Sequence, residues 1–194
     1  MSVIAQTNSD LLIFVVGTSG SGKDSVMRET LTYLRNQGIP CRLLTRIITR
    51  KSDVNEKSIY MTIDQFKNHL NDFGLYWNVY DNWYGCPKAD IEETMVQREL
   101  LLINVSRAVL HEARRKYPLC KIILITVPEA TAELRIKKRG RENKIGLEKR
   151  LQRMKTLVDM PAPDLVVENI GDLHETTEKV GNYLKNLYLI SKQE

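Results

Sequence analysis

Residues 11–25 read LLIFVVGTSGSGKDS. The run at 11–16 is wholly apolar and continues directly into glycine, which is typical of a buried strand that ends in a turn. Gly17, Gly22 and Lys23 then match G-x-x-x-x-G-K, the Walker A pattern. In such a loop the backbone N–H groups point at phosphate oxygens, and the following helix directs the positive end of its dipole to the same place. We therefore predict a nucleotide-phosphate site here, with Lys23 bridging the β- and γ-phosphates.

The predicted site covers the whole loop and the start of the next helix. Its members are Gly17, Thr18, Ser19, Gly20, Ser21, Gly22, Lys23, Asp24 and Ser25. The additional Gly20 and the helical pattern after the loop favour a phosphate site over a plain glycine-rich turn. We expect the ligand to be ATP together with Mg²⁺.

One residue departs from the Walker A pattern. A Ser or Thr usually follows the lysine and holds Mg²⁺ through its hydroxyl, whereas here Asp24 follows it and Ser25 comes next. The apolar run at 100–105 supplies Asn104 where P-loop enzymes often carry a carboxylate. We infer that the magnesium-directed charge has moved into the loop, to Asp24 with Ser25. The alternative, that Asp24 only caps the helix, stays open because Asp favours helix N-termini.

Length and composition fit one α/β domain. The chain has 194 residues, of which 42% are hydrophobic and 27% charged, so it can bury an ordinary core. A net charge of +5 is too small to indicate a nucleic-acid-binding protein, but it suits phosphate ligands. Cys41, Cys86 and Cys120 lack the spacing of metal ligands and are expected to be reduced thiols.

The sequence before the apolar run at 11–16 has no basic segment, and the run itself is too short for a signal peptide or a membrane span. We therefore expect a cytoplasmic protein that binds neither membrane nor nucleic acid. We expect it to act as a monomer or homodimer on a small phosphorylated molecule.

Short apolar runs alternate with helical patterns along the chain. Besides the run at 11–16, strands are predicted at 41–48, 100–105, 122–127 and 165–167, and helices at 22–37, 106–116, 129–138, 145–158 and 172–190. Thr62 and Pro87 are expected to begin two further short helices, ending near His69 and Arg98. Such alternation predicts a parallel sheet covered by helices on both faces.

We interpret residues 1–194 as a single kinase-sized domain with two additions. The core would comprise 11–45, 99–138 and 147–194. The segment 46–98 is richer in aromatic residues and is interpreted as an insert that closes over a substrate. The segment 139–146 would be a short lid.

Basic residues crowd the sequence LRIKKRGREN and the helix predicted after it. They are Arg135, Lys137, Lys138, Arg139, Arg141 and Arg150. A solvated helix face would explain these charges by itself. However, Gly140 interrupts the cluster as a hinge would, and phosphoryl transfer needs several positive groups around the transferring phosphate. We predict that Arg139 and Arg141 act in catalysis and that Arg135 contacts the nucleotide.

The acceptor side is predicted from TRIITR, which contains Arg46 and Arg50, and from the aromatic segment GLYWNVYDNWYG at 74–85. Core packing accounts for some of these aromatic residues, but Tyr84 precedes a glycine and has a polar tip suited to a phosphate. The predicted acceptor-binding residues are Arg46, Arg50, Trp77, Tyr84, Asn104, Arg107 and Arg150.

The order of these features resembles the guanylate-kinase-like fold over about residues 11–168. Within that fold the chain is most similar to the ribose 1,5-bisphosphate phosphokinases of phosphonate breakdown, the PhnN family. The motifs that carry this resemblance are GTSGSGKDS at 17–25, ITR at 48–50, Trp77, WYG at 83–85, NVSRA at 104–108, ARRKYP at 113–118 and RGREN at 139–143. The resemblance implies a P-loop NMP-kinase α/β fold of three layers, with a parallel sheet, a small substrate-binding insert and a lid.

True guanylate kinases differ at the positions that read the base. Their glutamate before YYG falls on Leu75, their serine after YYG falls on Cys86, and one strand-end aspartate falls on Asn104. Arg50 and Tyr84 remain. A guanine needs an acidic acceptor for its N–H groups, and losing it costs about 1.5–3 kcal/mol. The resemblance therefore implies a sugar-phosphate acceptor.

The reaction implied by the resemblance converts ribose 1,5-bisphosphate and ATP to 5-phosphoribosyl 1-diphosphate. One alternative is a guanylate kinase or another nucleoside monophosphate kinase, against which Leu75 and Cys86 argue. A second is a non-catalytic guanylate-kinase-like interaction module, against which the intact loop with Lys23 argues.

Overall fold

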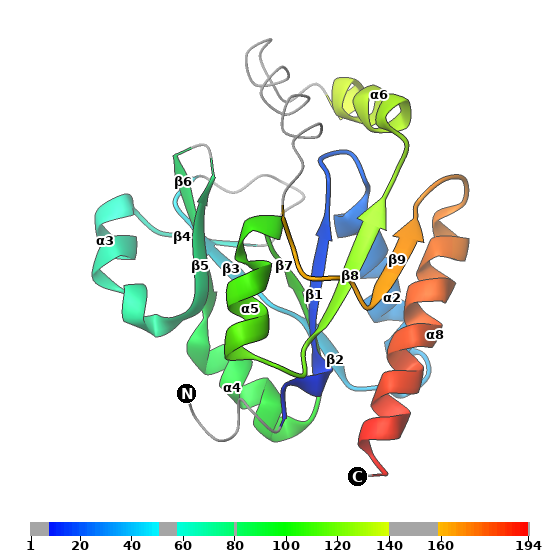
Figure 1. The fold of residues 1–194 in the computed structure, drawn as a ribbon, viewed down its shortest axis with the longest axis horizontal. Coiled ribbons are helices and arrows are strands. Elements are labelled where there is room, and N and C mark those ends of the chain that lie inside the picture. The colour runs from blue at the N-terminus through cyan, green and yellow to red at the C-terminus, as the bar shows by residue number, and fades with distance from the viewer. Residues whose placement is uncertain (1–7, 51–57, 80, 140–158, 194) are drawn as a thin grey trace.

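The structure is a computed structural model that describes residues 8–50, 58–79, 81–139 and 159–193. Its centre is a parallel five-stranded sheet in the order β2-β7-β1-β8-β9 (Figure 1). These strands are β1 (Leu12–Gly17), β2 (Cys41–Leu43), β7 (Leu100–Asn104), β8 (Lys121–Thr126) and β9 (Leu165–Glu168). Because β1 lies in the middle, the glycine loop that follows it emerges at the centre of the carboxyl edge of the sheet.

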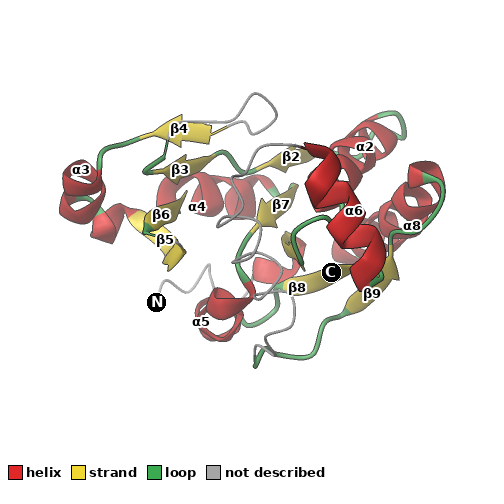
Figure 2. Cartoon of the chain, turned by 90° about the horizontal axis from the view of Figure 1, so that it is seen from above, coloured by secondary structure: helices red, strands yellow, loops and turns green. Residues whose placement is uncertain are grey.

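Helices cover both faces of this sheet, as the apolar strands predict. The helices that lie around the central sheet are α2 (Lys23–Arg35), α4 (Lys88–Gln97), α5 (Leu110–Lys116), α6 (Glu129–Arg139) and α8 (Leu173–Ser191). Along β1, Ile13 and Val15 pack with α2 and α8, whereas Leu12, Phe14 and Val16 pack with α4 and α5. Figure 2 shows α6 from above, over the ends of the central strands on the α2 and α8 side.

The helix that follows the glycine loop, α2, packs directly on the C-terminal helix α8. Gly181 permits this approach, since a Cβ there would lie 2.3 Å from the Tyr33 ring. The Tyr33 hydroxyl also donates a hydrogen bond to Oδ1 of Asn182, at 2.7 Å. The C-terminal end of α2 is therefore supported by α8.

A second, mostly antiparallel sheet lies beside the α4 and α5 face of the first, in the order β4-β3-β6-β5. Its strands are β3 (Arg46–Ile48), β4 (Ser58–Tyr60), β5 (Phe73–Val79) and β6 (Asn82–Pro87). Between β4 and β5 lie α3 (Ile63–Asn68) and the 3₁₀ turn η2 (Leu70–Asp72). All four strands fall within the segment 46–98.

The two faces of the second sheet bury different aromatic residues. Phe66 of α3 stacks on Phe73 and contacts Trp83 on the outer face. On the inner face Trp77 stacks on Tyr84, with ring centroids 5.5 Å apart and planes only 4° from parallel. The inner aromatic pair therefore faces the core that packs on the central sheet.

Local signals explain how these elements begin and end. Thr62 caps the start of α3, as the sequence predicts, and the structure adds that Gln65 completes a capping box with it. Arg98, at φ 54°, ends α4, and its guanidinium binds both carboxylate oxygens of Asp10 and the carbonyl of Ser191. Asp10 belongs to the 3₁₀ turn η1 (Ser9–Leu11), so this one side chain ties together the start, middle and end of the chain.

Two sequence predictions need correction. The strand predicted at 41–48 is not continuous: Leu44 is buried in the core and donates its N–H to Leu102, after which the chain leaves the first sheet and enters the second. The helix predicted at 106–116 begins as a separate 3₁₀ turn, η3 (Arg107–Val109), which Ser106 caps. Strands β4, β5 and β6 of the segment 46–98 were not predicted. The other described helices and strands lie within a few residues of their predicted bounds.

The helix predicted at 145–158 and nearly all of the predicted lid at 139–146 lie outside the described residues. Across the ranges that the structure does describe, no helix has both the length and the apolar character needed to span a membrane.

Candidate active site

The glycine loop adopts a conformation that only its glycines allow. Gly20 and Gly22 have φ values of 81° and 79°, in the left-handed region. A Cβ at Gly17 would lie 2.5 Å from the carbonyl oxygen of Ile125, and one at Gly20 would lie 2.6 Å from that of Ala132. The N–H of Ser21 closes a turn onto Thr18, at 3.2 Å. Ser19, which lies between Thr18 and Gly20 in this loop, is half-buried. Successive N–H groups in such a turn form an anion-binding concavity.

The back of this loop is held by side chains from two distant segments. Arg135 of α6 donates from Nη1 to the Gly20 carbonyl, at 3.4 Å. Asn169, which follows β9, donates from Nδ2 to the Ser21 carbonyl, at 2.7 Å. Both bonds engage carbonyl oxygens and therefore use none of the loop's N–H groups.

Lys23, Asp24 and Ser25 form the first turn of α2, where the helix dipole is positive. Oδ1 of Asp24 accepts a hydrogen bond from Nδ2 of Asn104, at 2.6 Å. Asn104 ends β7, next to β1, and is nearly buried. The exposed carboxylate of Asp24 is thus fixed at the carboxyl edge of the sheet by Asn104, which stands where P-loop enzymes often carry a carboxylate.

Arg46 links this donor side to the second sheet. Its Nη1 donates to the backbone carbonyl of Asn104, at 3.0 Å. The same guanidinium lies over the Tyr84 ring, 5.7 Å from the ring centroid, within the range of a cation–π contact. Arg46 therefore contacts the end of β7 and the inner aromatic pair at once.

Tyr84 lies at the centre of the acceptor side. Its hydroxyl accepts a hydrogen bond from Nε of Arg50, at 3.4 Å, while its ring stacks on Trp77. Tyr84 pairs with Ile48 and Trp77 across the second sheet. The structure thus brings together four predicted acceptor residues, Arg46, Arg50, Trp77 and Tyr84.

Deeper on the same face of the second sheet, Leu75 lies opposite Cys86. Both are fully buried in the apolar core that also contains Ile91 and Val109. Burial raises the pKa of the Cys86 thiol to about 12, so this thiol is neutral at physiological pH. The core side chains that neighbour Trp77 and Tyr84 on this face are therefore apolar and uncharged.

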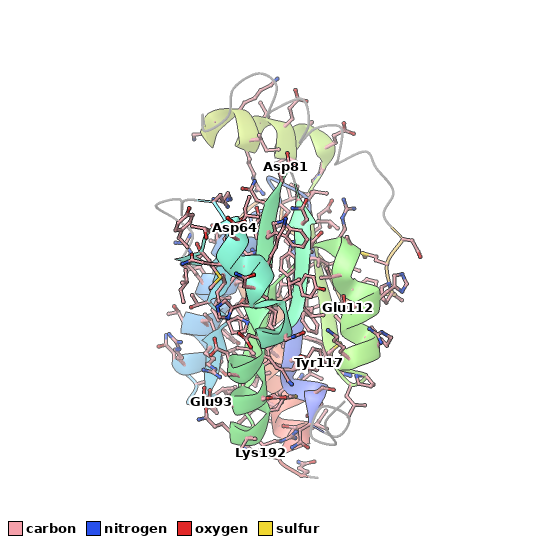
Figure 3. All side chains as sticks on the ribbon, turned by 90° about the vertical axis from the view of Figure 1, so that its left-hand side faces the viewer. Asp64, Asp81, Glu93, Glu112, Tyr117 and Lys192 are labelled. Carbon is pink, nitrogen blue, oxygen red and sulfur yellow. The ribbon has the colours of Figure 1, made fainter. Side chains whose placement is uncertain are left out.

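The β5–β6 hairpin ends at Asp81, which lies at the same end of the molecule as α6 (Figure 3). The carboxyl ends of β1 and β7 lie at this end too (Figure 1). The donor loop, α6 and the hairpin that carries the acceptor aromatics therefore lie at the same end of the molecule.

The family model for guanylate kinase matches residues 9–187. The chain belongs to the guanylate kinase family. Its members are phosphotransferases, and this kinase carries the intact phosphate loop described above. It is an ATP-dependent phosphotransferase.

The matches to two curated relatives cover almost the whole length of those proteins. The ribose 1,5-bisphosphate phosphokinase PhnN of Pseudomonas fluorescens (strain SBW25) is 33% identical over 177 residues, which are 87% of this chain and 92% of that protein. The protein of the same name from Thiobacillus denitrificans (strain ATCC 25259 / T1) is 34% identical over 180 residues, 90% of this chain and 93% of that protein. The predicted similarity to the PhnN family is confirmed.

Among solved structures, guanylate kinase from Anaplasma phagocytophilum matches with a TM-score of 0.63 at 16% identity. The match covers 90% of this chain and 84% of that chain. At this identity the likeness shows the fold alone, and it confirms the guanylate-kinase-like α/β fold predicted from the sequence.

The remaining predicted site residues of the kinase lie near the same edge or outside the described ranges. Arg107 begins η3, three residues after Asn104, and is half-buried. Arg139 is the last residue of α6, but its side chain is not described. Arg141 and Arg150 lie outside the described residues. The roles of these four arginines stay predictions.

Sequence reasoning missed Asn169 and Thr176. Both are buried polar residues close to the loop, and they bind each other, with Thr176 Oγ1 donating to Asn169 Oδ1 at 3.2 Å. A signal existed: Asn169 directly follows the apolar strand β9, and residues at strand ends on the carboxyl edge face the site in such folds.

Proposed function

We propose that this kinase transfers the γ-phosphoryl group of ATP to the 1-phosphate of ribose 1,5-bisphosphate and so forms 5-phosphoribosyl 1-diphosphate. An oxygen of the 1-phosphate bonds to the γ-phosphorus, the bond from that phosphorus to the β,γ-bridging oxygen breaks, and ADP leaves. The names of the curated relatives support this acceptor, and we propose that the reaction serves phosphonate breakdown, as it does in the family that the sequence resembles.

At the donor end, the backbone of residues 17–23 and the side chain of Lys23 would hold the triphosphate. The concave loop with its outward carbonyls fits this ligand, because each N–H that faces inward can donate to a phosphate oxygen. Lys23 supplies positive charge where the transferring group gains negative charge.

The chain also offers a fitting place for Mg²⁺. Asp24 presents a carboxylate oxygen, a preferred ligand atom for this ion, and Asn104 fixes its direction, while Ser25 offers a hydroxyl one residue later. Bound there, the ion would neutralise charge on the ATP phosphates. The bond to Asn104 favours this role over helix capping, since the carboxylate points to the edge of the sheet where ATP would lie.

At the acceptor end, Arg50 and Tyr84 would bind one phosphate of the sugar. A guanidinium with a phenol beside it offers several N–H and O–H donors to phosphate oxygens. Trp77 keeps the Tyr84 ring in place by stacking on it. We propose that Arg46, Asn104 and Arg107 approach the other end of the acceptor, nearest to the donor loop.

The single observation that carries this acceptor is the apolar character of the side chains on the same sheet face as Tyr84. A guanine needs acceptors for its N–H groups, and the positions that would supply them hold Leu75 and Cys86, both fully buried. Leaving such donors unpaired in an apolar site is costly. Ribose 1,5-bisphosphate has no base and makes no such demand.

The reaction needs no general base from the protein. The acceptor phosphate has a second pKa near 6 and is largely ionised at pH 7. The residues therefore act by binding, orienting and charge stabilisation. Arg139 and Arg141 would complete the positive surroundings of the transferring group.

The buried free thiols of Cys41, Cys86 and Cys120 support our further proposal that the enzyme acts in the reducing cytoplasm.

The test is a side-by-side assay of ADP release with Mg-ATP and either ribose 1,5-bisphosphate, GMP or no acceptor. We expect ribose 1,5-bisphosphate to exceed GMP by at least about a hundredfold in kcat/KM, which is about 2.7 kcal/mol of transition-state discrimination. Phosphorus NMR should show a new diphosphate on the sugar. If GMP is the better acceptor, the enzyme is a guanylate kinase. If ATP binds and neither acceptor is used, this proposal is wrong.

A further inference from the structure

Asn169 occupies an unusual place for an amide side chain. It directly follows the edge strand β9, and its backbone N–H continues the ladder by donating to Thr126, at 2.8 Å. The side chain turns inward and is 4% exposed. Its Nδ2 donates to the carbonyl of Ser21, and its Oδ1 accepts from the hydroxyl of Thr176.

The Ser21 carbonyl needs this partner. Ser21 is fully buried, so water does not reach its polar groups, and its own Oγ has no hydrogen-bond partner within the described residues. A buried carbonyl that lost its donor would tend to rotate toward another one. Rotation of that peptide would turn the N–H of Gly22 away from the concave side of the loop, where a phosphate oxygen needs it.

Gly22 shows how closely the amide and the loop fit. A Cβ built at Gly22 would lie 2.4 Å from Nδ2 of Asn169. The glycine is thus required by the φ value of 79° and also by the approach of this amide. Arg135 supports the neighbouring Gly20 carbonyl only from 3.4 Å, a longer bond from a half-buried side chain.

Thr176 orients the amide. An Asn side chain can turn over and exchange its oxygen for its nitrogen, which would present an acceptor to the Ser21 carbonyl. The Thr176 hydroxyl, itself buried in the first turn of α8, can donate to Oδ1 and so favours the orientation in which Nδ2 faces the loop. The order Thr176, Asn169, Ser21 is therefore a directed chain of hydrogen bonds from α8 to the glycine loop.

We propose that Asn169, oriented by Thr176, is a positioning residue that keeps the glycine loop in its phosphate-binding shape. It acts on the nucleotide through the Ser21–Gly22 peptide and does not contact the reacting atoms. This inference rests on the loop's role in binding ATP and is independent of which acceptor the enzyme uses.

The test measures binding of β,γ-imido-ATP by calorimetry, which needs no acceptor. Asn169→Leu, which keeps the size but removes the donor, should weaken binding at least about tenfold. Thr176→Val should weaken it about threefold to fivefold, and Thr176→Ser, which restores the hydroxyl, should bind within about twofold of the parent. Asn182→Leu is the matched control. It removes the hydrogen bond that Tyr33 of α2 donates to Asn182 of α8, away from the loop.

A second readout separates positioning from a general loss of structure. In steady-state assays the KM for ATP should rise in the Asn169 and Thr176→Val variants, while the KM for the acceptor stays within about twofold. Folding is monitored by thermal unfolding without nucleotide. If Asn169→Leu does not fold, Thr176→Val and Thr176→Ser carry the test.

The proposal is overturned if Thr176→Val binds the analogue as well as the parent, or if Thr176→Ser is no better than Thr176→Val. It is also overturned if the KM values for both substrates rise together. A loss of analogue binding in these variants supports it, even if ribose 1,5-bisphosphate proves not to be the acceptor.

Discussion

The donor and acceptor sides of this enzyme are built from different materials. The donor side is backbone: glycines at 17, 20 and 22 shape a loop whose carbonyls are held from behind by Arg135 and Asn169. The acceptor side is made of side chains, a stacked Trp77–Tyr84 pair with arginines around it, carried on a separate sheet. Backbone N–H groups recognise any phosphate in the right place, whereas side chains decide which molecule carries it.

This difference teaches where specificity can change. A substitution in the loop has few acceptable outcomes, since a Cβ at Gly17 or Gly20 meets backbone atoms of a neighbouring strand or helix. On the second sheet, replacing a side chain alters the surface while the strand pairing stays. A family with one donor and several acceptors can therefore keep the first region and vary the second.

Breaking the donor side should have the largest effect. We expect Lys23→Ala to lower kcat by at least about a thousandfold, because the ammonium group stabilises charge that develops in the transition state. Steady-state assays at saturating ATP would measure this. The exposed Lys88→Ala on α4 is the control and should be near normal. Activity of Lys23→Ala within about threefold of the parent would show that the loop is not the donor site.

Arg139→Ala and Arg141→Ala would show whether the predicted lid belongs to the donor side. Each should lower kcat by about tenfold to a hundredfold and raise the KM for ATP less, because a charge that acts in the transition state affects kcat first. Lys138→Ala, an exposed neighbour on α6, is the matched control. Variants with unchanged kcat would return the basic cluster to a solvated helix face.

Tyr84→Phe sharpens the comparison from the acceptor side. The ring and its stacking on Trp77 are kept, but the hydroxyl that accepts from Arg50 is lost. We expect the KM for the acceptor to rise about tenfold while the KM for ATP is unchanged. Tyr76→Phe, on the opposite face of the same sheet, should affect neither. An equal rise in both KM values would contradict the assignment of Tyr84 to the acceptor alone.

Asp24→Asn tests how the donor side uses its carboxylate. If Asp24 is directed at Mg²⁺, the Mg²⁺ concentration for half-maximal activity should rise about fivefold, since a neutral amide oxygen is a weaker ligand. Asn remains a good residue for a helix start, so the stability of α2 should change little. Titrations with Mg²⁺ and thermal unfolding measure the two effects. A lower melting temperature with an unchanged Mg²⁺ requirement would support the capping role instead.

The last prediction concerns stability alone, and it compares the two sheets. Burial raises the pKa of Cys86, in the second sheet, to about 12 and that of Cys120, beside the first, to about 11, from a model-peptide value of 9.0. Each neutral thiol therefore stabilises the fold fully below pH 9.0, and this contribution is lost as pH rises toward the folded-state pKa. The slope is about 1.4 kcal/mol per pH unit for each thiol.

Urea unfolding at several alkaline pH values would measure this loss. Cys86→Ala and Cys120→Ala should each remove part of the slope. Equal reductions would mean that both sheets unfold in one transition. If only Cys120→Ala changes the slope, the second sheet opens separately from the first.

The sequence predicted the parts of the fold that depend on local patterns. The strands β1, β7 and β8 are continuous apolar runs because both faces of the central sheet are covered, and the loop after β1 follows from its glycines. The division of 41–48 between two sheets was not predicted, since each half has an arginine followed by two aliphatic residues and only the long-range bond from Leu44 to Leu102 shows where the chain turns.

The candidate site shows the same limit. Arg46, Arg50, Trp77 and Tyr84 were predicted from residue type and resemblance, and the structure shows that strand pairing and stacking bring them together. Asn169 was missed although it directly follows an apolar strand, because that position does not reveal its partners, and the hydroxyl of Thr176 carries no local signal at all. The contact of Asn169 with Ser21, 148 residues earlier, exists only once the sheet has formed.

The bond from Asn169 to the loop also has a consequence for synthesis on the ribosome. The glycine loop is translated before β8, which touches it, and long before Asn169, which orients its backbone. A nascent chain that has not yet released α8 carries the complete Walker motif without the contacts that shape it. We therefore expect nucleotide to stabilise the chain only after α8 has been made, because Thr176 of α8 orients the amide that holds the loop.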